Sequence, residues 1–455
     1  MVGALGKHLA LIGFMGAGKS TVGREVARLT ERPFLDIDAE IERRFGPIAE
    51  LFERGEAEFR RLEEQVVAEA LAVEEPHVLA LGGGAVLSAT TRERLGRTAF
   101  TAFLPVAPDT AWRRVRETGR PLAADEGDFR RLFAERLPLY REIADTEAGD
   151  ADGVLLGALG VALADEVELP GPAAIVADEG VLELHPPPRE GPVHRVPRGE
   201  EAKTLDVVRR LWDELALGRD GTIVGFGGGS TTDVAGFVAA TYLRGVRWIA
   251  VPTTLTGQVD AAIGGKTGIN LAKGKNFAGA FHFPERVVVD PSFLSTLPAE
   301  ERRAGMAEVV KIGLLAGRDV WNLPEREMIA ACAAYKCAVV LSDPYERAGR
   351  RRILNLGHTF GHALEAGSGY AVTHGEAVAL GLLAALRLSG RPTDVVEDLL
   401  RPEPVEADRE VAWAALKRDK KGEGVFVLLE APGRPLVTTV PDDAARAALD
   451  ALIRK

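Results

Sequence analysis

The sequence is poor in cysteine, lysine and histidine, and it has no long apolar run. Its 455 residues include two cysteines, too few for a disulfide framework, which fits a reducing cytoplasm. No apolar stretch reaches the ~18–20 residues of a membrane span. No secretory pattern precedes the glycine-rich motif at Gly13. The formal net charge is −11 and no basic run occurs, so the chain is not expected to bind nucleic acid. From the cysteine content and the lack of long apolar runs, we expect a cytoplasmic protein that binds no membrane.

The length and the hydrophobic pattern predict several domains. At roughly 100–200 residues per domain, 455 residues suggest two to four. Apolar runs alternate with helical patterns over 1–165, which predicts a parallel sheet covered by helices. A stretch rich in Gly and Pro follows, so we place a linker at 166–172. Strands and helices alternate again over 173–298, and 299–455 is mainly helical in pattern.

A glycine-rich motif follows the first apolar run. Residues from Gly13 to Ser20 read G-F-M-G-A-G-K-S, the pattern of a phosphate-binding loop, although a glycine-rich turn can match by chance. Lys19 would supply charge to the β- and γ-phosphates, and the Ser20 hydroxyl could ligate Mg²⁺. Asp36 and Asp38 follow a short apolar strand. In a kinase, one such acid can hold Mg²⁺ through water and the other can accept a hydroxyl proton.

Four further segments follow this motif in a fixed order. They are Phe59-Arg60-Arg61, Gly82-Gly83-Gly84, Thr118-Gly119-Arg120-Pro121-Leu122 and the run from Glu135 to Tyr140. Each arginine taken alone is compatible with a solvated helix residue. Together with the loop and the acid pair, the set resembles shikimate kinase over nearly the whole first domain.

This resemblance implies a role for each matching residue. The ATP-binding positions are Gly13, Gly16, Gly18, Lys19, Ser20, Thr21 and Arg120, with Arg120 in the lid. The shikimate-binding positions are Asp38, Arg60, Gly83 and Arg136, and the Mg²⁺-associated ones are Ser20 and Asp36. The implied catalytic residues are Lys19, Asp38 and Arg120. Arginine suits the carboxylate of shikimate because its fork pairs with both oxygens.

The distribution of lysine is informative because the chain has only 12, against 44 arginines. None lies between 20 and 202, whereas five lie between 260 and 340. Lys266 and Lys275 are each flanked by glycine, which favours a phosphate or carboxylate site over a chance cluster.

A second glycine turn follows the apolar run that begins at Thr222. Gly227-Gly228-Gly229-Ser230 comes directly after this strand, with Asp233 on the predicted helix that follows. The pattern suits a dinucleotide pyrophosphate at a helix N-terminus, although it is not a strict G-x-G-x-x-G and an ordinary strand–turn–helix also fits.

A set of metal-ligand residues lies further along the chain. His358 and His362 are four residues apart, His374 follows, and Glu308 precedes them. One carboxylate and two imidazoles with an open position are typical of catalytic Zn²⁺. Capping or core histidines are the alternative, and the spacing alone leaves three candidates for the two imidazole ligands.

These motifs together resemble 3-dehydroquinate synthase from about Asp178 to Lys421. The resemblance implies Zn²⁺ (or Co²⁺) on Glu308, His358 and His374, with His362, Lys266 and Lys311 catalytic. The implied substrate residues are Arg244, Asp260, Lys266, Asn276, Lys311, Lys336, Arg351, Asn355 and Lys420. The implied NAD residues are Asp178, Glu200, Lys203, Gly228, Gly229, Asp233, Thr253, Thr254, Lys275, Phe293 and Thr296. One extra residue before Arg351 makes Arg350 its rival, and Lys421 is a rival of Lys420.

The two resemblances imply a fold and a function. The expected fold is an α/β P-loop kinase domain, then an NAD-binding Rossmann-like α/β subdomain and a mainly helical metal-binding subdomain. The expected reactions are phosphorylation of shikimate by ATP with Mg²⁺ and conversion of 3-deoxy-arabino-heptulosonate 7-phosphate to 3-dehydroquinate with NAD. Arg244 matches an arginine that reaches a neighbouring subunit, which implies a homodimer. Two alternatives remain: a second half that makes another cyclitol, and a first half that senses nucleotide.

Overall fold

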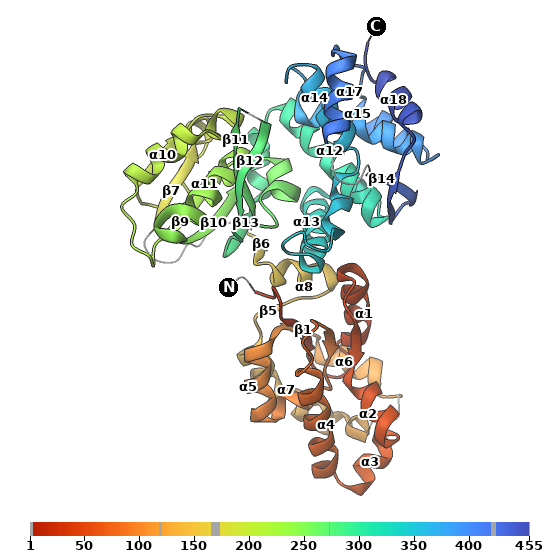
Figure 1. Cartoon of the computed structure of the whole chain (residues 1–455). Helices are drawn as coiled ribbons and strands as arrows, with labels where there is room; N and C mark the ends of the chain where they lie inside the picture. Colours follow the sequence, from red (N-terminus) through yellow and green to blue (C-terminus); the bar gives the residue numbers. More distant parts are fainter. Residues whose placement is uncertain (1–2, 118–120, 165–172, 273, 420–424, 455) are drawn as a thin grey trace. The chain divides into compact units, whose positions relative to one another are not determined.

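The computed structural model describes residues 3–117, 121–164, 173–272, 274–419 and 425–454 (Figure 1). The chain divides into two compact units, residues 1–160 with 337–342 and residues 161–336 with 343–455. Each unit is built on a parallel sheet of its own, as predicted from the alternating pattern. Among the described residues, no helix has both the length and the apolarity needed to cross a membrane.

A five-stranded parallel sheet in the order β2-β3-β1-β4-β5 forms the centre of the first unit. The strands are β1 (His8–Ile12), β2 (Phe34–Asp36), β3 (Val78–Ala80), β4 (Ala99–Phe103) and β5 (Thr146–Glu147). Every residue of β1, β3 and β4 is buried, because helices cover both faces of a sheet of this kind. The alternation of apolar runs and helical patterns over 1–165 predicted a parallel sheet covered by helices, and the structure confirms it.

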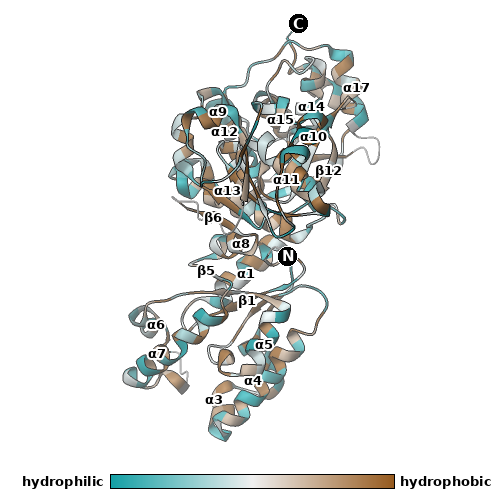
Figure 2. Ribbon diagram, turned by 90° about the vertical axis from the view of Figure 1, so that its left-hand side faces the viewer, coloured by the Kyte–Doolittle hydropathy of each residue, from teal (hydrophilic) through white to brown (hydrophobic). Residues whose placement is uncertain are grey.

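Eight α-helices of the described first unit surround this sheet. They are α1 (Lys19–Thr30), α2 (Ile37–Phe45), α3 (Ile48–Arg54), α4 (Glu56–Ala70), α5 (Ala89–Thr98), α6 (Pro108–Val115), α7 (Glu126–Ile143) and α8 (Ala151–Ala158). Hydrophilic and hydrophobic residues alternate along α3, α4 and α5, as expected for helices with one face on the core (Figure 2).

The second unit contains a six-stranded parallel sheet in the order β6-β13-β10-β9-β7-β8. The strands are β6 (Val161–Leu163), β7 (Ala173–Asp178), β8 (Val193–Val196), β9 (Thr222–Gly227), β10 (Arg247–Pro252) and β13 (Arg286–Val289). Helices α9 (Glu179–Leu184), α10 (Leu205–Glu214) and α11 (Gly229–Thr241) accompany it, with an antiparallel hairpin of β11 (Lys266–Leu271) and β12 (Gly274–Phe281). The predicted linker at 166–172 lies outside the described residues, and the domain limits stay predictions.

The rest of the second unit is mainly helical, as predicted. Its helices are α12 (Ala299–Ala316), α13 (Glu325–Ser342), α14 (His358–Gly367), α15 (His374–Leu388), α16 (Asp394–Leu400), α17 (Arg409–Asp419) and α18 (Asp442–Asp450). Helix α14 packs against α15 and α17, and α12 packs against α15. A hairpin of β14 (Val425–Ala431) and β15 (Arg434–Thr439) joins them, which the sequence reading did not anticipate.

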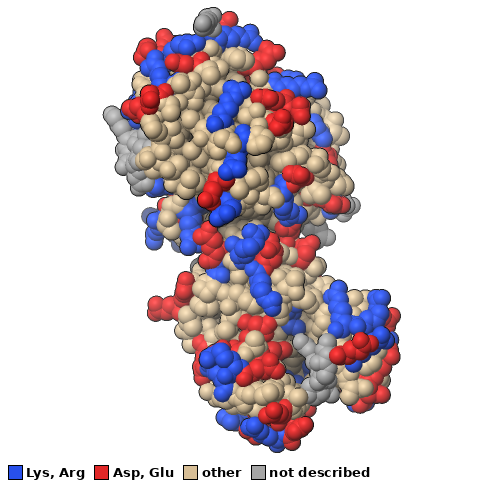
Figure 3. All heavy atoms as spheres, turned by 90° about the vertical axis from the view of Figure 1, so that its right-hand side faces the viewer, with Lys and Arg blue, Asp and Glu red and all other residues tan. Residues whose placement is uncertain are grey.

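Charges of both signs are intermingled on the surface. On the face shown in Figure 3, basic and acidic side chains alternate over both units and neither sign forms one continuous area.

Candidate active sites

The phosphate-binding motif forms the turn between β1 and α1. Gly13, Gly16 and Gly18 have φ angles of 147°, 81° and 91°, in the region that glycine adopts without strain. The Lys19 ammonium donates to the carbonyl oxygens of Gly13 at 2.8 Å and Phe14 at 3.1 Å. The lysine charge therefore lies within the loop, where nucleotide phosphates bind in loops of this pattern.

The two residues predicted to associate with Mg²⁺ lie together. Ser20, in the first turn of α1, donates its hydroxyl to Asp36 Oδ2 at the end of β2. The other oxygen of Asp36 accepts the backbone N–H of Ala39 at 3.3 Å and caps α2. A hydroxyl and a carboxylate beside a phosphate loop are oxygen ligands of the kind that Mg²⁺ prefers.

Three charged side chains converge on the glycine segment after β3. A side chain at Gly82 would overlap the carboxylates of Glu63 and Asp38, and one at Gly84 would overlap the Arg60 guanidinium. Arg60 donates to Glu63 at 2.6 Å. Burial raises the pKa of the Glu63 carboxyl, and Arg60 opposes this. The glycines thus let the acids and the arginine lie directly against this segment, and Arg60, Glu63 and Gly84 line a pocket beside it.

Two side chains of α7 hold the carbonyl oxygen of Gly83. Arg136 Nη1 donates to it at 3.2 Å and the Tyr140 hydroxyl at 2.5 Å. Arg136 is buried, and its Nε has no hydrogen-bond partner within the described ranges. Burial lowers the pKa of Arg136. A buried guanidinium with an unused N–H favours an anionic ligand such as a carboxylate.

Thr21, the last of the predicted loop residues, lies on α1 and is exposed.

The second glycine turn joins β9 to α11 with little space. A Cβ at Gly228 would lie 3.1 Å from Thr254 Cγ2, and one at Gly229 would lie 2.9 Å from the Ala261 Cβ. Gly227 has a φ of 157°. The backbone at the start of α11 therefore stays bare of side chains, as an approaching pyrophosphate requires.

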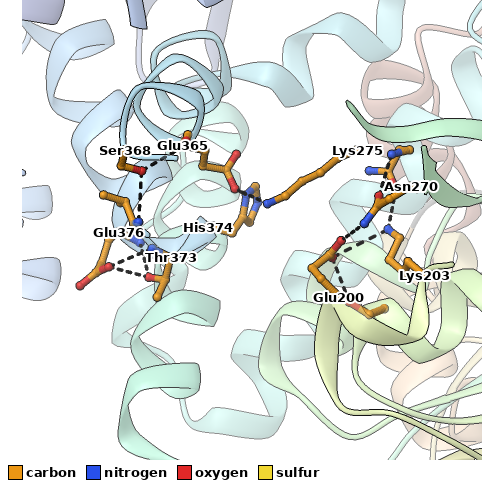
Figure 4. A network of polar contacts seen from close by, with 12 residues as sticks. Glu200, Lys203, Asn270, Lys275, Glu365, Ser368, Thr373, His374 and Glu376 are labelled. Atoms are coloured by element: carbon orange, nitrogen blue, oxygen red, sulfur yellow. Dashed lines mark hydrogen bonds and ion pairs between the residues drawn. The ribbon is translucent and has the colours of Figure 1, made fainter. Parts of the chain in front are cut away.

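A polar network lies beside this turn and contains three of the predicted nucleotide residues. Lys203 donates to Asp233 Oδ2 at 2.5 Å and also to Asn276 Oδ1. Glu200 accepts from Asn270 at 2.6 Å (Figure 4). Burial raises the pKa of Asp233 to about 6, although Lys203 opposes this. Because every charge has a partner, the network holds its geometry before any ligand binds.

Apart from Lys275, which lies on β12, the remaining predicted nucleotide residues lie at or just after the carboxyl ends of β7, β10 and β13. Asp178 caps α9 by accepting the N–H of Gly180 at 2.8 Å, and Thr253 donates its N–H to the Gly227 oxygen at 2.9 Å. Phe293 and Thr296 lie in the turn after β13. Carboxyl ends of parallel strands share one edge of a sheet, which is where open α/β sheets bind ligands.

Glu308, His358 and His374 bring three ligand atoms together, all within 4.8 Å of one another. Glu308 Oε1 lies 3.4 Å from His358 Nε2 and 3.5 Å from His374 Nε2. Burial raises the pKa of Glu308, but Lys311 and His358 outweigh it and hold the pKa well below its usual range. Burial lowers the pKa of His374, but the carboxylates of Glu308 and Glu365 on either side of the ring outweigh this effect and raise the pKa to about 9. One carboxylate and two imidazoles suit Zn²⁺ or Co²⁺ with an open position.

His362 is not part of this group. It lies one turn after His358 on α14, and the two ring centroids are 5.7 Å apart. Desolvation by the surrounding groups, and then the neighbouring His358, lower the pKa of His362 to about 4, although the side chain remains partly exposed to solvent. The ring is therefore neutral near pH 7 and can accept a proton.

Two buried lysines lie against the metal-ligand set. Asp260 pairs with Lys336, and its other oxygen lies 3.5 Å from Lys311, which also contacts Glu308. Burial raises the pKa of Asp260, but Lys311 and Lys336 outweigh it and lower the pKa to about 2. Burial lowers the pKa of Lys336, whereas Asp260 and Glu308 overcome the same effect at Lys311 and raise its pKa. These two acids and two lysines balance in charge, which offsets their desolvation.

The structure distinguishes Arg351 from its rival Arg350. Arg351 is buried and donates to the carbonyl oxygens of Gly264 at 3.0 Å and Pro344 at 2.9 Å, whereas Arg350 is exposed. Nearby, the Lys266 ammonium lies 2.7 Å from Glu346. Burial lowers the pKa of Arg351 and Glu346 opposes this effect, so the same carboxylate acts on both Lys266 and Arg351.

Two other predicted substrate residues lie at the surface. Asn355 is exposed just before α14, and Arg244 is exposed in a tight turn where it has a φ of 68°. Arg120, Lys420 and its rival Lys421 lie outside the described residues.

Four residues of these sites were missed by sequence reasoning. Glu63 and Glu365 could have been found, because each lies three residues after a predicted site residue, Arg60 or His362, on one helical face. Tyr140 carried the same kind of signal, because it lies four residues after Arg136 on α7 and ends a run that the resemblance includes. Glu346 has a φ of 57° in the loop with the extra residue, and spacing gives no clue to a side chain in an irregular loop.

Family comparisons agree with this division of sites. Residues 15–154 match the shikimate kinase family, 193–304 match the 3-dehydroquinate synthase N-terminal family, and 305–402 match the 3-dehydroquinate synthase C-terminal family. The 3-dehydroquinate synthase of Thermobifida fusca is 44% identical over 284 residues, which are 55% of this chain and 76% of that protein.

Among solved structures, the second unit resembles a 2-deoxy-scyllo-inosose synthase complexed with carbaglucose-6-phosphate, NAD⁺ and Co²⁺. The identity is 29% and the TM-score 0.55, over 61% of this chain and 90% of that one.

One relative matches both units. The bifunctional shikimate kinase/3-dehydroquinate synthase of Thermotoga maritima is 35% identical over 414 residues, which are 82% of this chain and 83% of that protein. The chain therefore belongs to the family of bifunctional shikimate kinase/3-dehydroquinate synthases, which carry these two activities of the shikimate pathway in one polypeptide.

Proposed function

We propose that the first unit binds ATP in the Gly13–Thr21 loop and shikimate beside the Gly82–Gly84 segment. Mg²⁺ would be held by Ser20 and Asp36, which already contact each other. Arg60 and Arg136 would clamp the shikimate carboxylate, because both guanidinium groups face this segment.

In this arrangement, transfer needs positioning more than covalent chemistry by the protein. Asp38 orients a ring hydroxyl of shikimate and accepts its proton as the hydroxyl oxygen bonds to the γ-phosphorus and the bond to ADP breaks. Lys19 and the lid residue Arg120 stabilise the charge on the phosphoryl oxygens. Tyr140 keeps the Gly83 carbonyl in place while this happens.

For the second unit, we propose that the pyrophosphate of NAD lies at the start of α11. The bare backbone at Gly228 and Gly229 fits this group, since a Cβ there would meet Thr254 or Ala261. The network of Glu200, Lys203 and Asp233 would hold the ribose and amide parts.

The proposed metal site consists of Glu308, His358 and His374, and the donor set fits Zn²⁺ or Co²⁺. When bound, NAD would take up and return a hydride, and the metal ion would polarise the carbon–oxygen bond of the carbon atom that is oxidised and then reduced.

Lys311 and Asp260 would bind hydroxyl groups of the sugar phosphate next to this site. Lys266, Asn276 and Lys420 bind its phosphate, and Arg351 and Asn355 complete the pocket. Neutral His362 accepts a hydrogen bond or a proton from the substrate.

The observation that carries the synthase assignment is the position of the metal-ligand set against the buried Lys311–Asp260–Lys336 group. The cyclase of another cyclitol would share the metal and NAD, so product identity tests the assignment.

The test is an assay of both activities on the intact chain, with and without a zinc chelator. We expect 3-dehydroquinate formation to disappear with the chelator and to return with Zn²⁺ or Co²⁺. Shikimate phosphorylation should persist once Mg²⁺ is restored. A different carbocycle, or a synthase activity that the chelator leaves intact, would contradict the assignment.

We also propose a homodimer in which Arg244 reaches the substrate phosphate of the partner subunit. Its exposed position in a tight turn allows this. Light scattering should give a mass twice that of the chain, and a monomer with full synthase activity would exclude the proposal.

A further inference from the structure

Glu365 is a buried acid that none of the roles above explains. It is 3% exposed and lies on α14, three residues after His362 and seven after His358. Residues at these spacings share one face of a helix. Helix α14 therefore directs a metal ligand, a neutral histidine and a carboxylate toward the same side.

The Glu365 carboxylate faces two basic groups. Its Oε1 lies 2.8 Å from Lys275 Nζ and 3.7 Å from His374 Nδ1, and Figure 4 shows Lys275 reaching Glu365 beside the His374 ring. The other ring nitrogen, Nε2, is the one that faces Glu308 at 3.5 Å. The His374 ring thus stands between two carboxylates, each facing a different nitrogen.

Lys275 is held in this position from a second side. Its Nζ lies 5.0 Å from the centre of the Tyr370 ring. The backbone N–H of Tyr370 donates to the Glu365 carbonyl oxygen at 2.7 Å, and the Ser368 hydroxyl donates to the same oxygen at 3.0 Å. The turn after α14 therefore fixes the backbone of Glu365 and the position of Tyr370, whose aromatic ring Lys275 contacts.

Lys275 also connects this turn to the nucleotide side of the site. It lies at the start of β12, and the next residue, Asn276, accepts a hydrogen bond from Lys203. Asn276 also donates its backbone N–H to Asn270 Oδ1 at 2.9 Å. Polar contacts thus run from Glu200 and Lys203 through the hairpin to Glu365 and His374.

We propose that Glu365 is a positioning residue, whose carboxylate orients the His374 ring as a metal ligand and anchors the β11–β12 hairpin through Lys275. The inference rests on the proposed function, because it takes Glu308, His358 and His374 as the ligands. A carboxylate that faces the second nitrogen of a metal-bound histidine fixes the tautomer and the ring orientation.

The test is metal retention by the full-length chain carrying Glu365→Gln. Removing such an outer partner costs about 10–100-fold in metal affinity. We expect the variant to lose Zn²⁺ to a competing chelator at a concentration lower by this factor. The visible spectrum of the Co²⁺-loaded chain should shift, because it reports ligand geometry.

Glu397→Gln is the matched control. It removes a carboxylate from an exposed ion pair with Arg387 in the same unit, and it should leave both the retention and the spectrum unchanged. Glu365→Asp is a second variant for the case in which Glu365→Gln does not fold. It keeps the negative charge but places it one methylene further from His374, so we expect an intermediate loss of Zn²⁺.

The outcomes separate this inference from the proposed function. Wild-type retention and spectrum in both Glu365 variants would overturn the positioning role while leaving the metal site standing. A wild-type chain that binds no Zn²⁺ would overturn the metal site itself, and the positioning role with it.

Discussion

Replacing Lys19 with methionine is expected to lower shikimate phosphorylation by about 10²–10³-fold, the effect of removing one preorganised donor from a transition-state charge. Methionine keeps most of the length but removes the ammonium group that now donates to the Gly13 and Phe14 oxygens. No other lysine can substitute, because the first 202 residues contain only Lys7 and Lys19. A coupled assay of ADP release with shikimate measures the loss.

Two controls accompany this variant. Lys7→Met removes the other lysine of the same unit outside the loop and should keep the wild-type rate. The synthase activity of the Lys19→Met chain should also be unchanged, because its proposed site lies in the other unit. Equal loss in both lysine variants, or an intact kinase in Lys19→Met, would exclude the proposed role of Lys19.

Replacing Glu308 with glutamine is expected to lower 3-dehydroquinate formation by at least about 10²-fold, since loss of even an outer partner of a metal ligand costs 10–100-fold. Glutamine removes the anionic ligand around which His358 and His374 gather. It also leaves Lys311 and Lys336 with only Asp260 as a negative neighbour in the buried group. Bound zinc should fall below one per chain, as measured by elemental analysis.

Glu300→Gln is the control for this change, because Glu300 lies about two turns earlier on α12 and is exposed. It should keep both the zinc and the synthase rate. The kinase rate of the Glu308→Gln chain should match the wild type. A variant that retains zinc and full synthase activity would remove Glu308 from the ligand set.

The fold was largely predictable because its strands are continuous apolar runs. The runs at β1, β3, β4, β7, β9 and β10 are buried between helices, and a strand covered on both faces has no polar alternation to obscure it. Strand β6 carries no such signal, because it lies at the edge of its sheet and only Val161 of its three residues is buried. The β14–β15 hairpin was missed although Pro432-Gly433 between two runs rich in Val and Leu is a turn signal.

The candidate sites were predictable where the chemistry lies within one motif. The loop around Lys19 is local, and its residues are neighbours in the chain. Which two of His358, His362 and His374 are the metal ligands could not be predicted in this way. A spacing of four residues places His358 and His362 on one helical face but does not show which groups face them. The ligand set depends on how α12 and α14 both pack against α15, and such contacts between distant segments leave no local pattern.

The pairing of β6 with β13 bears on how the two enzymes can be separated. The three residues of β6 follow α8 directly, yet they form an edge of the sheet in the second unit through Val161, Ala162 and Leu163. A cut placed after residue 165 would remove these three residues from the sheet. Strand β13 would then be an edge strand with unpaired backbone groups, which favours strand pairing between molecules. A synthase fragment that begins at Val161 keeps this edge strand, so β13 stays paired on both sides, with β6 and with β10.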